Sequence, residues 1–140
     1  MSIIQCAPIV FRARLIAGNM NFLSHSFKIA LYTSAASLDQ TTLTYTTNGE
    51  VVSPGYTAGG APAIASTVAV GTSNIYVNFS DVTWSDPALD ITAAGAMIYS
   101  TTNIDLPPVV ILSFGPPVRK TGTFTVKFPA STQETALIRI

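Results

Sequence analysis

Short strand-like segments follow one another along most of this chain, and this feature constrains its fold more than any other. The segment "SFKIALYT" (26–33) alternates strongly apolar side chains with other types, which is the period-two pattern of a half-buried strand. Gly, Pro, Asn or Ser bounds each segment, as turns require. Further segments of this kind are "STVAV" (66–70), "NIYVNF" (74–79), "GAMIYS" (95–100), "PVVILSF" (108–114), "GTFTVKF" (122–128) and "TALIRI" (135–140).

The links between these segments favour antiparallel pairing. The tripeptide "GTS" (71–73) joins two of them and predicts a hairpin. Parallel strands need long, usually helical crossovers, and the sequence shows no helical pattern between its strand segments. We therefore predict an all-β fold, an antiparallel β-sandwich of jelly-roll type. The 140 residues suit one domain, which we place at 26–140.

The first 25 residues differ from the rest and leave two interpretations open. In "VFRARLIAGNMNF" (10–22), Gly18 follows the last apolar position of a short helical pattern, and glycine commonly ends a helix. The same residues also alternate Phe11 and Leu15 with two arginines, as an extended arm would. We predict an N-terminal arm or short helix over residues 1–25.

Charge is scarce in this chain. Seven basic and seven acidic residues make up 10% of it, against about 25% in an ordinary domain. A net charge of zero offers no basic stripe for nucleic acid and no electrostatic attraction to a membrane, so we expect neither as a partner. Cys6 is the only cysteine, which rules out an intrachain disulfide and a cysteine zinc cluster.

Residues that could carry chemistry are few and do not form a recognisable pattern. His25 is the only histidine, and no G-x-S-x-G nucleophile elbow is present. Asp81, Asp86 and Asp90 lie close in sequence but lack the spacing of a calcium loop, and an Asx turn at Asp86 is the favoured interpretation. We predict a protein that is not an enzyme and needs no cofactor or metal.

Two segments are candidates for contact with a partner, with ordinary internal packing as the competing interpretation. The long loop at 35–63 is rich in glycine and tyrosine, and loops of this length are usually functional or folded on themselves. Tyrosine is a useful contact residue because it is rigid and large. The candidate contact residues in the loop and in the N-terminal segment are Tyr45, Gly55, Tyr56, Gly59, Gly60, Phe11, Arg12, Arg14 and Phe22.

Trp84 also admits two interpretations. A tryptophan near Asp81 and Asp86 could stack on a sugar ring, and this group is the only gathering of an aromatic side chain with carboxylates that the sequence suggests. The apolar neighbours of Trp84 favour a core or edge anchor at least as strongly.

The chain contains, in order, the blocks "FKIALYTSAA", "YTTNGEV", "GYTAGG", "VNFSDVTW", "ITAAGAMIY", "LSFG", "GTFTVKFP" and the closing "IRI". Together these blocks resemble a family of small structural proteins of tailed bacteriophages. The similarity extends from about Phe27 to Ile140. Pro107 and Pro108 stand where we expect family members to be more polar, so we predict a contact peculiar to this chain at these two residues.

The resemblance implies a virion component. Our first expectation is a capsid decoration, or cement, protein that forms a homotrimer on the capsid surface and clamps neighbouring major capsid subunits. A neutral, hydroxyl-rich surface suits many identical copies packed closely together. The alternative is a head-fibre, neck or tail accessory protein that binds a host surface glycan.

Overall fold

The computed structural model describes residues 2–140 and shows a mostly antiparallel β fold with one short helix, α1 (Ile9–Ile16). The predicted all-β class is confirmed, whereas jelly-roll connectivity stays a prediction. The strands are β1 (Phe27–Tyr32), β2 (Ala61–Ala63), β3 (Ala65–Val70), β4 (Ile75–Phe79), β5 (Val82–Ser100), β6 (Pro108–Val126) and β7 (Ile138–Arg139).

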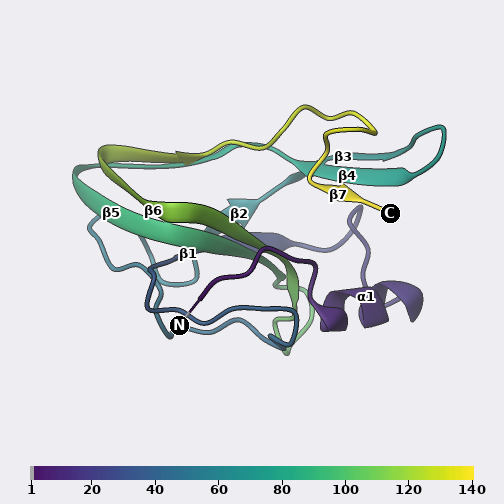
Figure 1. Cartoon of the computed structure of the whole chain (residues 1–140), viewed down its shortest axis with the longest axis horizontal. Helices are drawn as coiled ribbons and strands as arrows, with labels where there is room; N and C mark the ends of the chain where they lie inside the picture. The colour runs from purple at the N-terminus through teal and green to yellow at the C-terminus, as the bar shows by residue number, and fades with distance from the viewer. Residues whose placement is uncertain (1) are drawn as a thin grey trace.

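The strands form two sheets of unequal size (Figure 1). The large sheet has the order β2-β1-β5-β6 and the small sheet has the order β3-β4-β7. The predicted hairpin is confirmed, because β3 and β4 pair antiparallel across a turn that the Gly71 N–H closes by donating to the Asn74 carbonyl at 2.7 Å. In Figure 1 the end of this hairpin and the C terminus lie beyond the long β5–β6 pair, above α1.

Strands β5 and β6 are much longer than the sequence predicted. Each has 19 residues, and together they form one antiparallel ladder with register shifts. The segment around Asp86, expected to be a solvated loop, is a bulge within β5 between the pairs Ser85↔Thr123 and Asp90↔Thr121, and its Leu89 is buried. The long pair bends at one end of the molecule and contributes to both layers (Figure 1).

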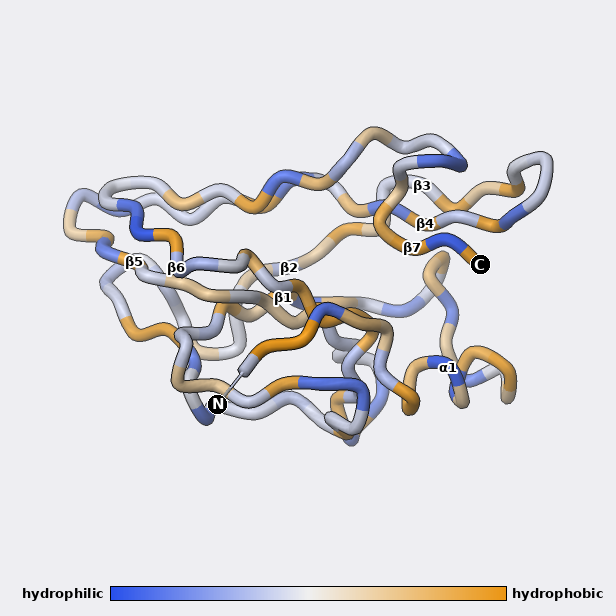
Figure 2. Tube along the Cα trace, in the orientation of Figure 1, coloured by the Kyte–Doolittle hydropathy of each residue, from blue (hydrophilic) through white to orange (hydrophobic). Residues whose placement is uncertain are grey.

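Strand β1 is buried on both faces, not half-buried as its alternation predicted. One face contributes Phe27, Ile29 and Leu31 to the main core between the two layers. The other face, with Ala30 and Tyr32, lies under a second cluster that the first residues of the chain and the loop after β1 cover. A hydropathy trace shows this central hydrophobic region, and shows hydrophobic segments at the free end of the small sheet as well (Figure 2).

The N-terminal segment adopts the helical alternative and not the extended arm. Helix α1 ends at Ile16, two residues before Gly18, whose φ of +79° is the left-handed conformation common after a helix. Phe11 is 1% exposed and belongs to the main core. The helix is therefore packed onto the sandwich.

Candidate interaction surface

Glu50 is the centre of a buried polar cluster that the sequence analysis missed. Its side chain accepts hydrogen bonds from the Tyr45 hydroxyl at 2.5 Å, the Tyr56 hydroxyl at 2.6 Å and the Gly59 N–H at 2.8 Å. The residue is only 9% exposed. It is also the only charged residue from Gln40 to Ser80. A lone carboxyl group between two tyrosines was the available signal for this cluster.

The tyrosines of this cluster fasten the loop to the large sheet. The Tyr56 hydroxyl accepts the Leu31 N–H of β1 at 2.9 Å, and the Tyr99 hydroxyl of β5 donates to the Gly59 carbonyl at 2.6 Å. The Tyr45 and Tyr99 rings stack with their centroids 4.6 Å apart. The loop is therefore folded on its own domain.

The same burial changes how the tyrosines titrate. Burial, followed by the charge of Glu50, raises the pKa of Tyr99 to about 12. Burial and the hydrogen bond to Glu50 raise the pKa values of Tyr45 and Tyr56 well above the ordinary tyrosine value. These hydroxyls remain protonated hydrogen-bond donors over the ordinary pH range.

Most of the loop residues predicted to contact a partner pack against other parts of their own chain. Tyr56 and Gly59 are buried and Tyr45 is half-buried. Gly60 lies so close to β1 that an added Cβ would be 1.8 Å from the Ile29 carbonyl oxygen. Only Gly55 is exposed. The glycines are required by close approach to neighbouring backbone and side chains, so the competing interpretation, internal packing, accounts for them.

The N-terminal candidates divide in the same way. Phe11 is in the core and lies edge to face with the half-buried Phe22, at a centroid distance of 5.8 Å. Arg14 forms an ion pair with Asp105, while Arg12 is exposed. Of these four residues, Arg12 alone presents a freely exposed side chain.

Pro107 and Pro108, also predicted to form a contact, are both buried. The Pro107 carbonyl accepts the Ser100 N–H at 3.0 Å and so closes the turn between β5 and β6. In the single chain these prolines are packed at the start of β6, and their predicted contact with a partner stays a prediction.

Trp84 does not offer a surface for sugar stacking. It is 4% exposed and packs between Tyr56 and Phe124, with centroid distances of 5.8 and 6.4 Å. The two nearby carboxylates have local partners: Asp81 accepts the Phe128 N–H at 2.9 Å, and Asp86 accepts the Ala88 N–H at 2.8 Å. The Asx turn predicted at Asp86 is confirmed, and the interpretation of Trp84 as a core anchor fits the structure.

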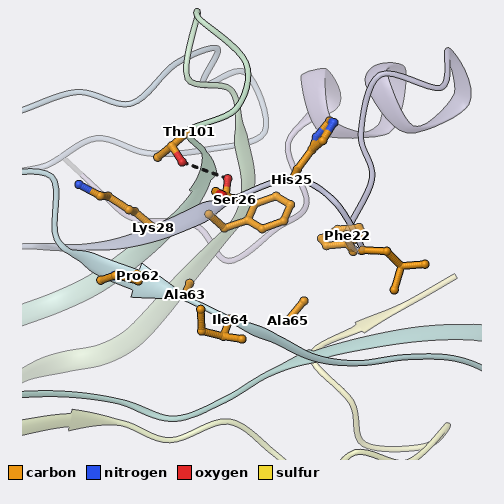
Figure 3. Close-up of a pocket in the computed structure, with 11 residues that line it drawn as sticks. Phe22, His25, Ser26, Lys28, Pro62, Ala63, Ile64, Ala65 and Thr101 are labelled. Carbon is orange, nitrogen blue, oxygen red and sulfur yellow. Dashed lines mark hydrogen bonds between the residues drawn. The ribbon is translucent and has the colours of Figure 1, made fainter.

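A pocket of about 400 Å³ opens beside the link between β2 and β3 (Figure 3). It is lined by parts of 22–28, by 62–65 and by Thr101. Ile64 and Leu23 on its walls are 61% and 83% exposed. His25 lies at this pocket, where its Nδ1 accepts the Asn21 N–H at 3.3 Å. We call this site the β2–β3 pocket.

Apolar side chains are also uncovered at the free end of the small sheet. Val70 pairs with Ile75, and Ile75 exchanges two backbone hydrogen bonds of 2.8 Å with Ile140, so the three side chains form a row across the sheet. They are 81%, 51% and 61% exposed. The next row contains Val68, which is 39% exposed, and the buried pair Val77 and Ile138. We call Val68, Val70, Ile75 and Ile140 the apolar overhang, because they continue the core-facing side of the sheet past the core.

No charged residue occurs anywhere from Val51 to Ser80, a stretch that includes β2, β3 and β4. The wall of the β2–β3 pocket that contains Ile64 comes from this stretch. Three of the four residues of the apolar overhang, Val68, Val70 and Ile75, come from it as well. The pocket is also lined by His25 and Lys28, so the uncharged part of its wall is the part that comes from β2, β3 and the link between them.

Comparisons with known proteins give no relative for this chain. No family model matches it, no curated protein matches it, and no solved structure matches it. Over residues 2–140, no group of three or more His, Cys, Asp or Glu side chains is placed to hold a metal ion. None of the helical structure described there is long and apolar enough to cross a membrane.

Proposed function

We propose that this chain is a non-enzymatic virion structural protein, a decoration protein that associates with its own copies and with the major capsid protein on the head of a tailed bacteriophage. The observation that carries the structural part of this proposal is the apolar overhang, of which Val68, Val70 and Ile75 lie in the uncharged strands β3 and β4. Exposed apolar surface of this kind marks sites of protein contact. The phage setting comes from the resemblance of the ordered sequence blocks.

The two-layer body suits such a role. The large sheet is covered on both faces around β1, and Glu50 fastens the loop that lies there, so we expect this part to be a rigid platform. The small sheet leaves apolar side chains uncovered. A rigid domain with one exposed apolar surface can bind neighbouring subunits without a large conformational change.

The expected mechanism is stabilisation by mass action. A protein that binds the expanded head lattice, and not its dissociated subunits, shifts the equilibrium toward the intact lattice. Binding therefore raises the resistance of the head to heat. The protein is made in the host cytoplasm and ends on the capsid surface.

Co-sedimentation with expanded heads that lack this protein tests the proposal. We expect saturable binding of hundreds of copies per head and a higher temperature of head disruption. Ile75→Lys places a charge in the apolar overhang and should weaken binding, whereas Val52→Lys changes a 94% exposed valine in the loop before β2 and serves as a matched control. Binding to no head, or an equal effect of both substitutions, would contradict the proposal.

A further inference from the structure

The four edge strands of the two sheets differ in how they are protected against pairing with another chain. Natural edge strands usually carry a charge or a proline, since an open row of backbone groups invites a further strand. In residues 2–140, β2 has Pro62, β6 has Pro116 with Arg119, and β7 has Arg139. Strand β3, "ASTVAV", has neither a charge nor a proline.

The outer side of β3 is ready for hydrogen bonding. Gly71 donates toward β4, and the direction of backbone groups alternates along a strand, so Val68 and Val70 point their N–H and C=O groups away from β4. Strand β3 has a neighbour on its β4 side only. The open edge of β3 is therefore continuous with the apolar overhang.

We propose that β3 pairs antiparallel with β3 of a second copy of this chain, about a two-fold axis near Val68. A two-fold contact places each surface against itself, so a charged edge would face its own like charge. The uncharged stretch from Val51 to Ser80 has no such repulsion. A second copy is the occupant that this property favours, because a charged partner would lose its hydration here without gaining an opposite charge.

Under this pairing the end of β3 in one copy lies beside the start of β3 in the other. Centred on Val68, the antiparallel register sets Val70 of one copy opposite Ser66 of the other. The exposed end of each apolar overhang then lies toward the start of the partner's β3, where the β2–β3 pocket opens beside Ile64. The contact occurs twice, and each copy covers apolar side chains of the other.

This inference deepens the self-association in the proposed function, and it gives a two-fold pair in place of the homotrimer that we expected from the sequence. The pairing does not depend on which larger structure the protein joins. A chain that stays monomeric but still decorates heads would overturn only this inference. A dimer that binds no head would overturn only the capsid role.

Sedimentation equilibrium of the purified full chain over a range of concentrations tests the pairing. We expect the mass to rise from 14.7 kDa to twice that value, with little dependence on salt because no ion pair is involved. Val68→Lys should abolish the rise by placing a lysine beside its own copy, and Val52→Lys should leave it intact. A wild-type chain that stays monomeric, a Val68→Lys chain that still dimerises, or a mass beyond two chains would overturn the proposal.

Cross-linking provides a second readout that does not depend on the stability of the variant. Replacing Cys6 with Ser removes the only native thiol, and Val68→Cys then places one thiol at the proposed axis. Directly paired residues on antiparallel strands have Cα atoms about 5.5 Å apart, within disulfide range. We expect a disulfide-linked dimer on mild oxidation with Val68→Cys and not with Val52→Cys in the same background. Equal yields from both positions would overturn the pairing.

Discussion

The large and small sheets differ in whether their apolar side chains are covered by the rest of the chain. Both contain apolar strands, but around β1 and the end of β5 that pairs with it the large sheet is covered on each face by other parts of its own chain. The small sheet keeps apolar side chains such as Val70 and Ile75 uncovered at its free end. The large sheet is therefore stabilised within the chain, and the small sheet is left for contact between chains.

Glu50 explains how the large sheet obtains its cover. A loop with many exposed backbone groups does not pack on a sheet unless those groups find partners. The carboxylate provides acceptors for two hydroxyls and one N–H, and Tyr56 links it directly to β1. At the free end of the small sheet, the Gln133 side chain accepts the Thr72 N–H at 2.5 Å, but Val70 and Ile75 remain 81% and 51% exposed. A single buried carboxylate can therefore decide whether a loop covers an apolar face or leaves it exposed.

Among the substitutions that test this difference between the sheets, replacing Glu50 should cause the largest loss in the free energy of unfolding. Glu50→Ala leaves the hydroxyls of Tyr45 and Tyr56 and the Gly59 N–H without their acceptor. Since each unsatisfied buried group costs about 1–3 kcal/mol, we expect a loss of about 3–5 kcal/mol in the free energy of unfolding. Urea unfolding followed by tryptophan fluorescence measures it, because Trp84 packs against Tyr56.

Glu50→Gln is the control for this substitution. It keeps the shape of the side chain and one acceptor oxygen, so we expect a smaller loss of about 1–2 kcal/mol. A loss below about 1 kcal/mol in Glu50→Ala would show that the loop is held by other contacts and would remove the distinction between the two sheets.

A pair of glycine substitutions separates the stability cost of a steric clash from the cost of an unfavourable backbone conformation. Gly60 and Gly122 both have positive φ, of +87° and +79°. An added Cβ at Gly60 would meet the Ile29 carbonyl of β1, whereas nothing lies within 4 Å of one at Gly122. We expect Gly122→Ala to cost about 1 kcal/mol from conformation alone, and Gly60→Ala to cost about 3 kcal/mol because the loop must also move away from β1. Thermal unfolding measures both, and equal losses would argue against tight cover of the large sheet.

The parts of the fold that sequence reasoning predicted correctly are those set by neighbours in the chain. The hairpin of β3 and β4 follows from two period-two segments and a short glycine-containing link. The end of α1 near Gly18 follows from a local helix signal. The length of β5 was missed because Asp86 and Pro87 read as a turn. They do form an Asx turn, but the strand pairing resumes on its far side.

The parts that were missed depend on residues distant in sequence. Alternation in β1 predicted one exposed face, yet the segment bridging Ile3 with Leu38 and the loop carrying Glu50 cover that face. Tyr56 and Gly59 were assigned to a partner because residue type does not say whether a loop residue points inward. Their direction is set by contacts with β1 and β5, which no short segment of sequence reveals.

A charge at the free end of the small sheet should have the smallest effect on the stability of the single chain. Val70 is 81% exposed, and surface substitutions away from special features usually change stability by no more than about 0.5 kcal/mol. We therefore expect Val70→Lys to leave the free energy of unfolding within that range when measured at concentrations where the chain is monomeric. A loss of more than about 2 kcal/mol would show that this valine is packed within its own chain, as a core valine is. The small sheet would then resemble the large one, and the uncovered region would have to be sought elsewhere. No loss would mean that the apolar side chain at Val70 does nothing for the isolated molecule, so its contribution would lie in what the protein contacts.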